Sequence, residues 1–237
     1  MIQATKDTIY TFKRYEKKYL LSKEKYDAFM DVADAYLEPD VYYKSLVCSI
    51  YYDSDDFELI RHSIESPVYK EKLRLRSYGV PSDDSAAFVE LKKKYKGVVY
   101  KRRVEMTAAQ AQEWLAGGRP PEESQITREI DWFLKMNDVS PKVFIGCDRT
   151  SYVAKDDPEL RITIDSGIRW RDSDLLLQSG DCGQELLEED QSLMEIKMPE
   201  AAPLWLARLL SNEEIFPTTY SKYGTCYKTE ILRKEDA

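Results

Sequence analysis

The sequence predicts an α+β fold, namely an eight-stranded antiparallel β-barrel with surrounding helices, from three observations. Eight segments alternate between apolar and polar residues, a short turn joins two of them, and amphipathic helical patterns separate the groups of strands. The clearest alternation places Leu160, Ile162 and Ile164 on one face of residues 159–165. Residues 96–97 form the short turn, so the strands on either side form an antiparallel hairpin. The other expected strands are residues 10–20, 47–52, 69–78, 86–94, 98–106, 143–153 and 193–198.

Helices are expected between these strands. The first begins after Ser22 as N-cap and carries apolar residues on one face as far as Leu37, with Pro39 beyond its end. Thr107 and Gln110 form a capping-box pattern at the start of another helix. Further helices are expected over residues 126–134, 203–210 and 222–232, and residues 170–191 read as a long connection.

Length and composition indicate a single domain over residues 1–237. The chain has 43% apolar residues, four widely spaced cysteines and a net charge of −8. An acidic chain of this kind is not expected to bind nucleic acid, since nucleic-acid-binding domains usually present a basic surface. No apolar run reaches the length of a membrane span and no signal peptide is visible, so a cytoplasmic protein that does not itself span a membrane is expected.

Charged residues repeat at every second position along several expected strands, which places them on one face of each strand. In the third strand Lys70, Lys72, Arg74 and Arg76 share a face opposite Leu73 and Leu75. The corresponding residues elsewhere are Arg14, Glu16 and Lys18 in the first strand, Glu90, Lys92 and Lys94 in the fourth, Lys101, Arg103 and Glu105 in the fifth, and Arg149, Arg161 and Lys197 in three later strands.

These faces have two possible interpretations. Each could be the solvated outer face of an ordinary antiparallel sheet. Alternatively they converge inside a barrel, which is favoured because cations outnumber acids on these faces in a chain that is acidic overall. The apolar faces would then pack against the helices, and eight strands can close a barrel. Clustered cations without partners would destabilise an empty interior, so a wet interior that holds an anion is expected.

Phosphate chains suit such an interior. Arginine binds two phosphate oxygens at once and lysine supplies a compact charge. The minority carboxylates could hold Mg²⁺ or Mn²⁺ or could pair with neighbouring cations, and both roles remain open for Glu16, Glu90, Glu105, Glu195 and Asp165. Other chemistries lack their residues: there is no P-loop or Rossmann glycine motif, and the only histidine, His62, lies on an expected helix.

Eight short motifs occur in an order that resembles a known family. They are Tyr15-Glu16-Lys17-Lys18-Tyr19, Ser49-Ile50-Tyr51-Tyr52-Asp53, Lys72-Leu73-Arg74-Leu75-Arg76-Ser77-Tyr78-Gly79, Val89-Glu90-Leu91-Lys92, Asp148-Arg149-Thr150, Arg161-Ile162-Thr163-Ile164-Asp165, Met194-Glu195-Ile196-Lys197 and Tyr220-Ser221-Lys222-Tyr223. Together they resemble the polyphosphate polymerase (VTC, vacuolar transporter chaperone) domain of the triphosphate tunnel metalloenzyme superfamily.

The resemblance implies a tunnel in which ATP donates its γ-phosphate to a growing polyphosphate chain, with Mn²⁺ or Mg²⁺ assisting. It implies catalytic phosphate binders at Lys18, Arg74, Arg76, Lys92, Arg149 and Lys222. Metal ligation is expected from Glu195, with Glu16 and Glu90 beside it. Weaker substrate contacts are expected from Arg14, Lys72, Lys94, Lys101, Arg103, Arg161, Lys197, Ser221 and Tyr223.

The sequence also departs from the wider superfamily. Many members that are hydrolases or cyclases begin with Glu-x-Glu-x-Lys, whereas this chain has Arg14-x-Glu16-x-Lys18, which favours the polymerase branch. The eukaryotic polymerases carry an SPX sensor domain and membrane helices that have no counterpart here, so any membrane partner is expected to be a separate protein. Two alternatives stay open: a tripolyphosphate or nucleoside-triphosphate hydrolase, and a non-catalytic polyphosphate-binding subunit.

Overall fold

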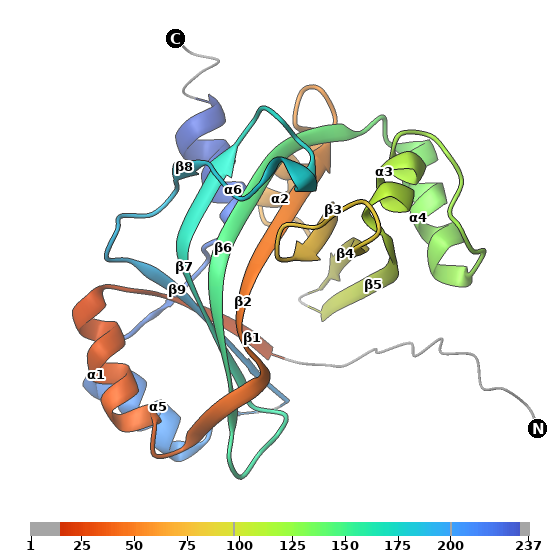
Figure 1. Cartoon of the computed structure of the whole chain (residues 1–237). Coiled ribbons are helices and arrows are strands. Elements are labelled where there is room, and N and C mark those ends of the chain that lie inside the picture. Colours follow the sequence, from red (N-terminus) through yellow and green to blue (C-terminus); the bar gives the residue numbers. More distant parts are fainter. Residues whose placement is uncertain (1–14, 97, 200, 233–237) are drawn as a thin grey trace, which may run out of the picture.

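A single antiparallel sheet organises the molecule (Figure 1). The computed structural model describes residues 15–96, 98–199 and 201–232, so Arg14 lies outside the described residues. The sheet has the order β10-β1-β9-β7-β6-β2-β3-β4-β5, and β8 pairs with β7. The strands are β1 (Tyr15–Leu21), β2 (Leu37–Asp53), β3 (Tyr69–Tyr78), β4 (Ala86–Tyr95), β5 (Val98–Thr107), β6 (Ser140–Ala154), β7 (Arg161–Arg171), β8 (Gln184–Glu185), β9 (Ser192–Met198) and β10 (Pro217–Thr218).

The expected closed barrel of eight strands is wrong in two respects. The described sheet has ten strands because the ladder also includes β8 and β10, whose two residues each are too short to produce a periodic pattern. The sheet is also not closed. Strand β10 pairs with the edge of β1 at Lys18 and Tyr19, so that edge is not free to pair with β5.

Curvature nevertheless brings distant strands together. Five strands separate β1 from β4 in the sheet order, yet Lys92 Nζ on β4 lies 3.7 Å from Glu16 Oε2 on β1. The sheet therefore wraps round its charged side, which we call the inner face, through side-chain contacts rather than through a continuous backbone ladder.

Helices pack on both sides of the sheet. They are α1 (Lys23–Ala33), α2 (Glu58–Ile64), α3 (Ala108–Leu115), α4 (Gln125–Met136), α5 (Leu204–Asn212) and α6 (Lys222–Cys226), followed by the π-helical segment Tyr227–Ile231 and, earlier in the chain, a 3₁₀ turn at Leu177–Ser179. Helices α1, α3, α4 and α5 cover the apolar side of the sheet, and α2 and α6 pack beside the inner face. Ser22 caps α1 and the Thr107–Gln110 capping box begins α3, both as expected. Leu37 belongs to β2 rather than to the first helix, because it pairs with Ala154 in the ladder with β6.

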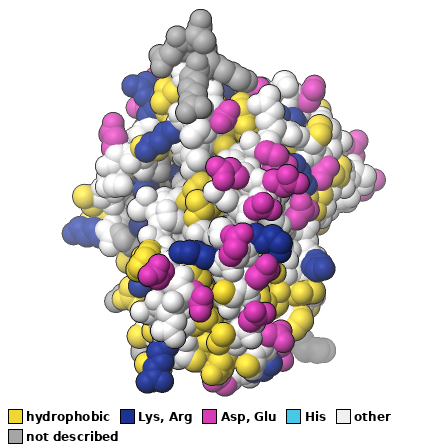
Figure 2. Space-filling view, turned by 90° about the vertical axis from the view of Figure 1, so that its left-hand side faces the viewer, with side chains coloured by type: hydrophobic (Ala, Val, Ile, Leu, Met, Phe, Trp, Pro, Cys, Tyr) yellow, Lys and Arg dark blue, Asp and Glu magenta, His cyan; other side chains and the backbone are white. Residues whose placement is uncertain are grey.

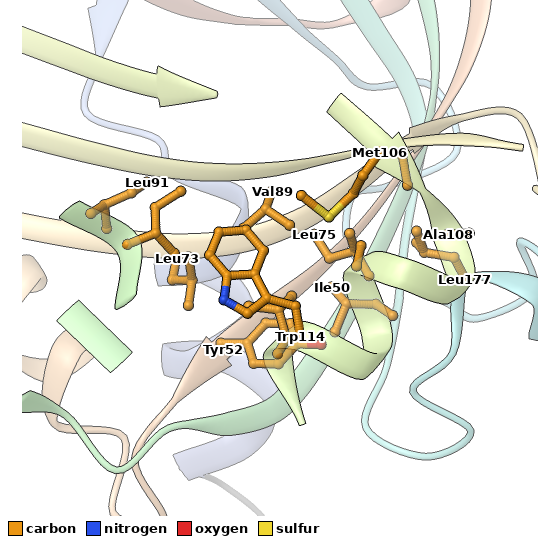
Figure 3. Packing of buried hydrophobic residues seen from close by; sticks show 14 of the residues in the cluster. Ile50, Tyr52, Leu73, Leu75, Val89, Leu91, Met106, Ala108, Trp114 and Leu177 are labelled. Atoms are coloured by element: carbon orange, nitrogen blue, oxygen red, sulfur yellow. The ribbon is translucent and has the colours of Figure 1, made fainter. Parts of the chain in front are cut away.

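Two apolar cores lie outside the inner face. In the first, Trp114 of α3 packs on Tyr52, Leu73 and Val89 of the sheet (Figure 3). Its indole Nε1 donates to Asp131 Oδ1 at 2.7 Å, so the buried polar group is satisfied. The second core lies between the sheet and helices α1 and α5. These cores account for the apolar faces of the strands.

A third apolar cluster lies on the other side of the sheet, beside the inner face. It is formed by α2, α6 and the π-helical segment, which pack on the apolar ends of β2, β6 and β7. Asp53 anchors this cluster: it accepts hydrogen bonds from the backbone N–H groups of Leu59 and Ile60 and from the Tyr223 hydroxyl. The cluster therefore fills one part of the concavity and holds the start of α6 toward the charged part.

The outer surface differs in charge from the inner face. On the face drawn in Figure 2, Asp and Glu side chains clearly outnumber Lys and Arg. Exposed acids in the connection after β7 include Asp172, Asp174, Glu188, Glu189 and Asp190. Among the described residues, none of the helices combines the length and the apolar character that crossing a membrane requires.

Candidate functional site

The inner face gathers cations from six strands and one helix. Strand periodicity directs every second side chain to this face, and the curvature of the sheet brings the rows together. Side-chain contacts show the convergence: Lys18 Nζ lies 3.1 Å from Glu195 Oε1, and Lys72 Nζ donates to Ser221 Oγ at 3.1 Å. The cations are Lys18 (β1), Lys72, Arg74 and Arg76 (β3), Lys92 (β4), Lys101 and Arg103 (β5), Arg149 (β6), Lys197 (β9) and Lys222 (α6).

Glu90 anchors three of these cations. Arg74 Nη2 lies 2.6 Å from Glu90 Oε2, while Arg103 Nε and Lys101 Nζ each lie 2.7 Å from Oε1. Burial alone would raise the pKa of this fully buried carboxyl, but the surrounding cations, Arg74 foremost, hold it well below its usual value. Both carboxylate oxygens are engaged by cations, so Glu90 orients Arg74, Arg103 and Lys101, and the geometry does not favour the metal ligation expected of it.

Asp165 anchors a second group. Arg149 binds it through two hydrogen bonds, Nε to Oδ1 at 2.6 Å and Nη2 to Oδ2 at 2.7 Å, and Lys222 Nζ also contacts Oδ2. Burial would raise the pKa of Asp165, but Lys222 and Arg149 outweigh it and lower the pKa to about 2. The carboxylate thus fixes one cation from β6 and one from α6 in the same place.

Three further cations, Lys72, Arg76 and Lys197, have no carboxylate within ion-pair distance among the described residues, although the charges of Glu195 and Glu16 act on Lys197. Lys72 contacts only the Ser221 hydroxyl, and the Nε of buried Arg76 donates to Ser49 Oγ at 3.1 Å. Burial and then the charges of Lys18 and other cations lower the pKa of Lys72 to about 7. Burial likewise lowers the pKa of Arg76, followed by repulsion from Arg74, and burial lowers that of Lys197. This surplus of positive charge is what an incoming polyanion would neutralise.

A pair of carboxylates, Glu16 and Glu195, lies beside this surplus of positive charge. Lys18 Nζ is 3.1 Å from Glu195 Oε1 and 3.8 Å from Glu16 Oε1. Burial and repulsion from Glu195 act to raise the pKa of Glu16, but Lys92 and Lys18 outweigh them and lower it. Lys18 and Lys222 similarly hold the pKa of Glu195 well below its usual value against the effect of burial. Both carboxylates are therefore ionised at neutral pH.

The pair fits a divalent ion only if phosphate completes its shell. Within residues 15–96, 98–199 and 201–232, no three His, Cys, Asp or Glu side chains are grouped to hold a metal by themselves. Mg²⁺ commonly takes only one or two protein carboxylates and fills its other positions with phosphate oxygens and water. The Glu16–Glu195 pair meets that requirement.

The remaining expected site residues lie at the border of the inner face. Arg161 is half exposed and its Nη1 reaches Asp40 Oδ2 at 3.4 Å. Lys94 is exposed toward the end of β4. Ser221 caps α6 and accepts from Lys72, whereas buried Tyr223 donates to Asp53 and stacks on Tyr51 below the cations. Tyr223 thus supports the site from beneath in this geometry.

Sequence reasoning missed three contributors to the inner face. Ser49 Oγ accepts a hydrogen bond from Arg76 Nε, and the Tyr51 hydroxyl accepts one from Arg74 Nη1 at 3.3 Å. The Tyr78 hydroxyl accepts a hydrogen bond from Arg103 Nη2 at 2.9 Å. The available signal was the same period of two, since Ser49 and Tyr51 are spaced as Arg74 and Arg76 are, and Tyr78 continues the latter row.

A curved antiparallel sheet that gathers cations on its concave face defines a protein built to bind a polyanion there. Comparison with known families makes the assignment specific: the VTC domain family matches residues 13–231, and this chain belongs to it. The chain is therefore a VTC domain of the triphosphate tunnel metalloenzyme superfamily, as its motifs predicted.

Solved structures agree on the fold. A candidate adenylate cyclase from Bacillus halodurans is 14% identical, with a TM-score of 0.56 over 92% of this chain and 95% of that one. A candidate adenylyl cyclase from Hippeastrum, described as having a dominant triphosphatase activity, is 15% identical, with a TM-score of 0.50 over 90% and 94% of the two chains. A search among curated proteins finds no match.

Proposed function

We propose that this chain is a polyphosphate polymerase, which transfers the γ-phosphate of ATP to the end of a polyphosphate chain bound on the inner face. The proposal rests on three buried or half-buried cations, Lys72, Arg76 and Lys197, that have no carboxylate within ion-pair distance in the part of the chain that the structure describes. They lie beside cations that Glu90 and Asp165 hold in place. Such a surplus is costly without an anion and suits a ligand with many regularly spaced charges.

The reaction needs no nucleophile from the protein. A terminal oxygen of the polyphosphate attacks the γ-phosphorus of ATP, the bond from that phosphorus to the β–γ bridging oxygen breaks, and ADP leaves with the bond's electrons. Catalysis then depends on alignment and on neutralising charge in the transition state. Arg74 and Arg149 are suited to orient phosphoryl oxygens because carboxylates fix their guanidinium groups. Lys72 and Arg76 are suited to neutralise charge because neither forms an ion pair with any of the described residues.

Glu195 and Glu16 are the residues that would hold Mn²⁺ or Mg²⁺. When bound, such an ion supplies further charge neutralisation and aligns phosphate oxygens. The protein's own contribution is to keep both carboxylates ionised, Glu16 chiefly through Lys92 and Glu195 chiefly through Lys18.

Hydrolysis of triphosphate is the competing activity, since the structural relative from Hippeastrum is described as a triphosphatase. Hydrolysis requires a group that orients water. On the inner face, Glu16, Glu90, Asp165 and Glu195 each already contact a cation, which favours transfer between phosphates over transfer to water.

Product analysis tests the proposal. Purified protein is incubated with ATP and Mn²⁺ or Mg²⁺, and ADP, orthophosphate and polymer are resolved. The proposal predicts that the amount of ADP formed equals the amount of phosphate added to polymer. Lys92→Met should form neither product. The matched control is Lys93→Met, because Lys93 lies on the opposite face of β4, where it pairs with Glu71 at 3.5 Å. Orthophosphate as the main product would instead establish a hydrolase, and binding without turnover would establish a polyphosphate-binding subunit.

A further inference from the structure

Tyr78 continues the row of inward side chains on β3 beyond Arg74 and Arg76. It occupies the last position of the strand, and its side chain is 49% exposed. Neither the phosphate contacts nor the metal pair described above makes use of this ring.

Neighbouring groups hold the Tyr78 ring in place. Arg103 Nη2 donates to its hydroxyl at 2.9 Å, and the Phe88 ring meets it edge to face with centroids 5.7 Å apart. Arg103 itself stacks 3.9 Å above the Phe88 centroid and is fixed by Glu90. Burial would raise the pKa of Tyr78, but Arg103 and Arg76 lower it, which places both cations in reach of the phenol. A ring fixed in this way loses little conformational freedom when a flat ligand stacks on it.

We propose that Tyr78, with Phe88 and Arg103 behind it, stacks against the nucleobase of the donor nucleotide. This inference rests on the proposed function, because it assigns the aromatic end of the same ligand whose phosphates the inner face would hold. Alternate residues of a strand are about 6.6–6.8 Å apart, so a base at Tyr78 places the next groups of the nucleotide along Arg76 and then Arg74. The row therefore orders a nucleotide with its base outward and its phosphates toward the unpaired cations.

Stacking on an aromatic ring is tolerant of base identity, because every nucleobase has a π-face. Stacking should therefore strengthen the binding of ATP but not that of tripolyphosphate, which carries a similar chain of phosphates but no base. Tyr78 could instead act only by supporting Arg103, and in that case it would affect both ligands equally.

Affinity measurements for the two ligands distinguish these roles. The dissociation constants of ATP and of tripolyphosphate are measured by calorimetry in EDTA, so that neither ligand turns over, for the wild type, Tyr78→Leu and Tyr78→Phe. We expect Tyr78→Leu to weaken ATP binding by roughly 5- to 140-fold, the range that loss of one base stack gives. Tripolyphosphate affinity should stay within about twofold, and Tyr78→Phe should bind ATP almost as the wild type does, because it retains the ring.

Tripolyphosphate binding also reports whether the variants fold. An equal loss of affinity for both ligands in Tyr78→Leu, or no loss for either, would overturn the stacking role. A wild type that binds neither ligand would overturn the proposed function itself. Failure of the two proposals can therefore be told apart in one set of titrations.

Discussion

Replacement of Asp165 by Asn tests how the anchored cations are held. The substitution keeps the shape of the side chain and removes its charge. Asp165 is fully buried, and it is the carboxylate that Arg149 grips through two hydrogen bonds and that Lys222 contacts. Without it, two buried cations face each other beside a group of other cations, so the folded state should become less stable.

The size of the loss can be worked from the structure. The pKa of Asp165 falls from its ordinary value of 3.8 to about 2, because Lys222 and Arg149 outweigh burial. One pKa unit corresponds to about 1.4 kcal/mol, so ionisation of this group contributes about 2 kcal/mol at neutral pH. Removing one partner of a buried pair costs about 3–5 kcal/mol in other proteins. We therefore expect Asp165→Asn to lower the free energy of unfolding by about 2–5 kcal/mol.

Urea unfolding at neutral pH measures this loss. The matched control is Asp148→Asn, because Asp148 also pairs with an arginine, Arg169 of β7, but is 61% exposed. Exposed pairs are typically worth less than about 1 kcal/mol. In the wild type, the contribution of Asp165 is present above its unfolded pKa near 3.8 and is lost as the pH falls through about 2. An Asp165→Asn variant as stable as Asp148→Asn would refute the anchoring role.

Four further outcomes follow from the inner face. Arg76→Ala should lower kcat/KM by an amount that corresponds to about 2–4 kcal/mol of lost transition-state stabilisation. The free energy of unfolding in urea should not fall, because the substitution leaves no carboxylate unpaired, and an unchanged kcat/KM would place Arg76 outside the substrate path. Tripolyphosphate should raise Tm more than chloride of equal ionic strength does, and most at low salt; equal shifts in a thermal melt would contradict a built polyanion site. Tripolyphosphate affinity should fall as pH rises above about 7, because Lys72 is then neutral and must take up a proton when the anion binds. Calorimetry of Lys72→Met should show no such dependence on pH, and a dependence that persists in this variant would mean that another group titrates. Glu195→Gln should lower metal-dependent turnover far more than metal-free tripolyphosphate binding, and full activity with an unchanged Mn²⁺ requirement would leave Glu195 as an ion-pair partner of Lys18.

Local patterns predicted most of the elements. Alternation identified the eight longer strands, and the Thr107–Gln110 capping box marked the start of α3, because both signals depend only on near neighbours in the chain. The two-residue strands β8 and β10 gave no such signal. They exist because tertiary contacts bring short segments against β7 and β1, and β10 occupies the edge that a closed barrel would have needed.

The charged faces were predictable, but their pairing was not. A period of two assigns Lys92 and Glu16 to inward rows, yet only the curvature of the sheet brings them within 3.7 Å across five intervening strands. Asp165 meets Lys222 for a similar reason, since the packing of α6 determines where that lysine lies. The division of the inner face into anchored and unpaired cations is therefore a property of the tertiary structure.

A crystal structure of the protein with bound tripolyphosphate would show whether the unpaired cations of the inner face bind a chain of phosphates. We expect phosphate oxygens within hydrogen-bond distance of Lys72, Arg76 and Lys197, with Glu90 and Asp165 still holding their cations. Tripolyphosphate ordered only on outward lysines such as Lys93, with no phosphate at the inner face, would contradict it.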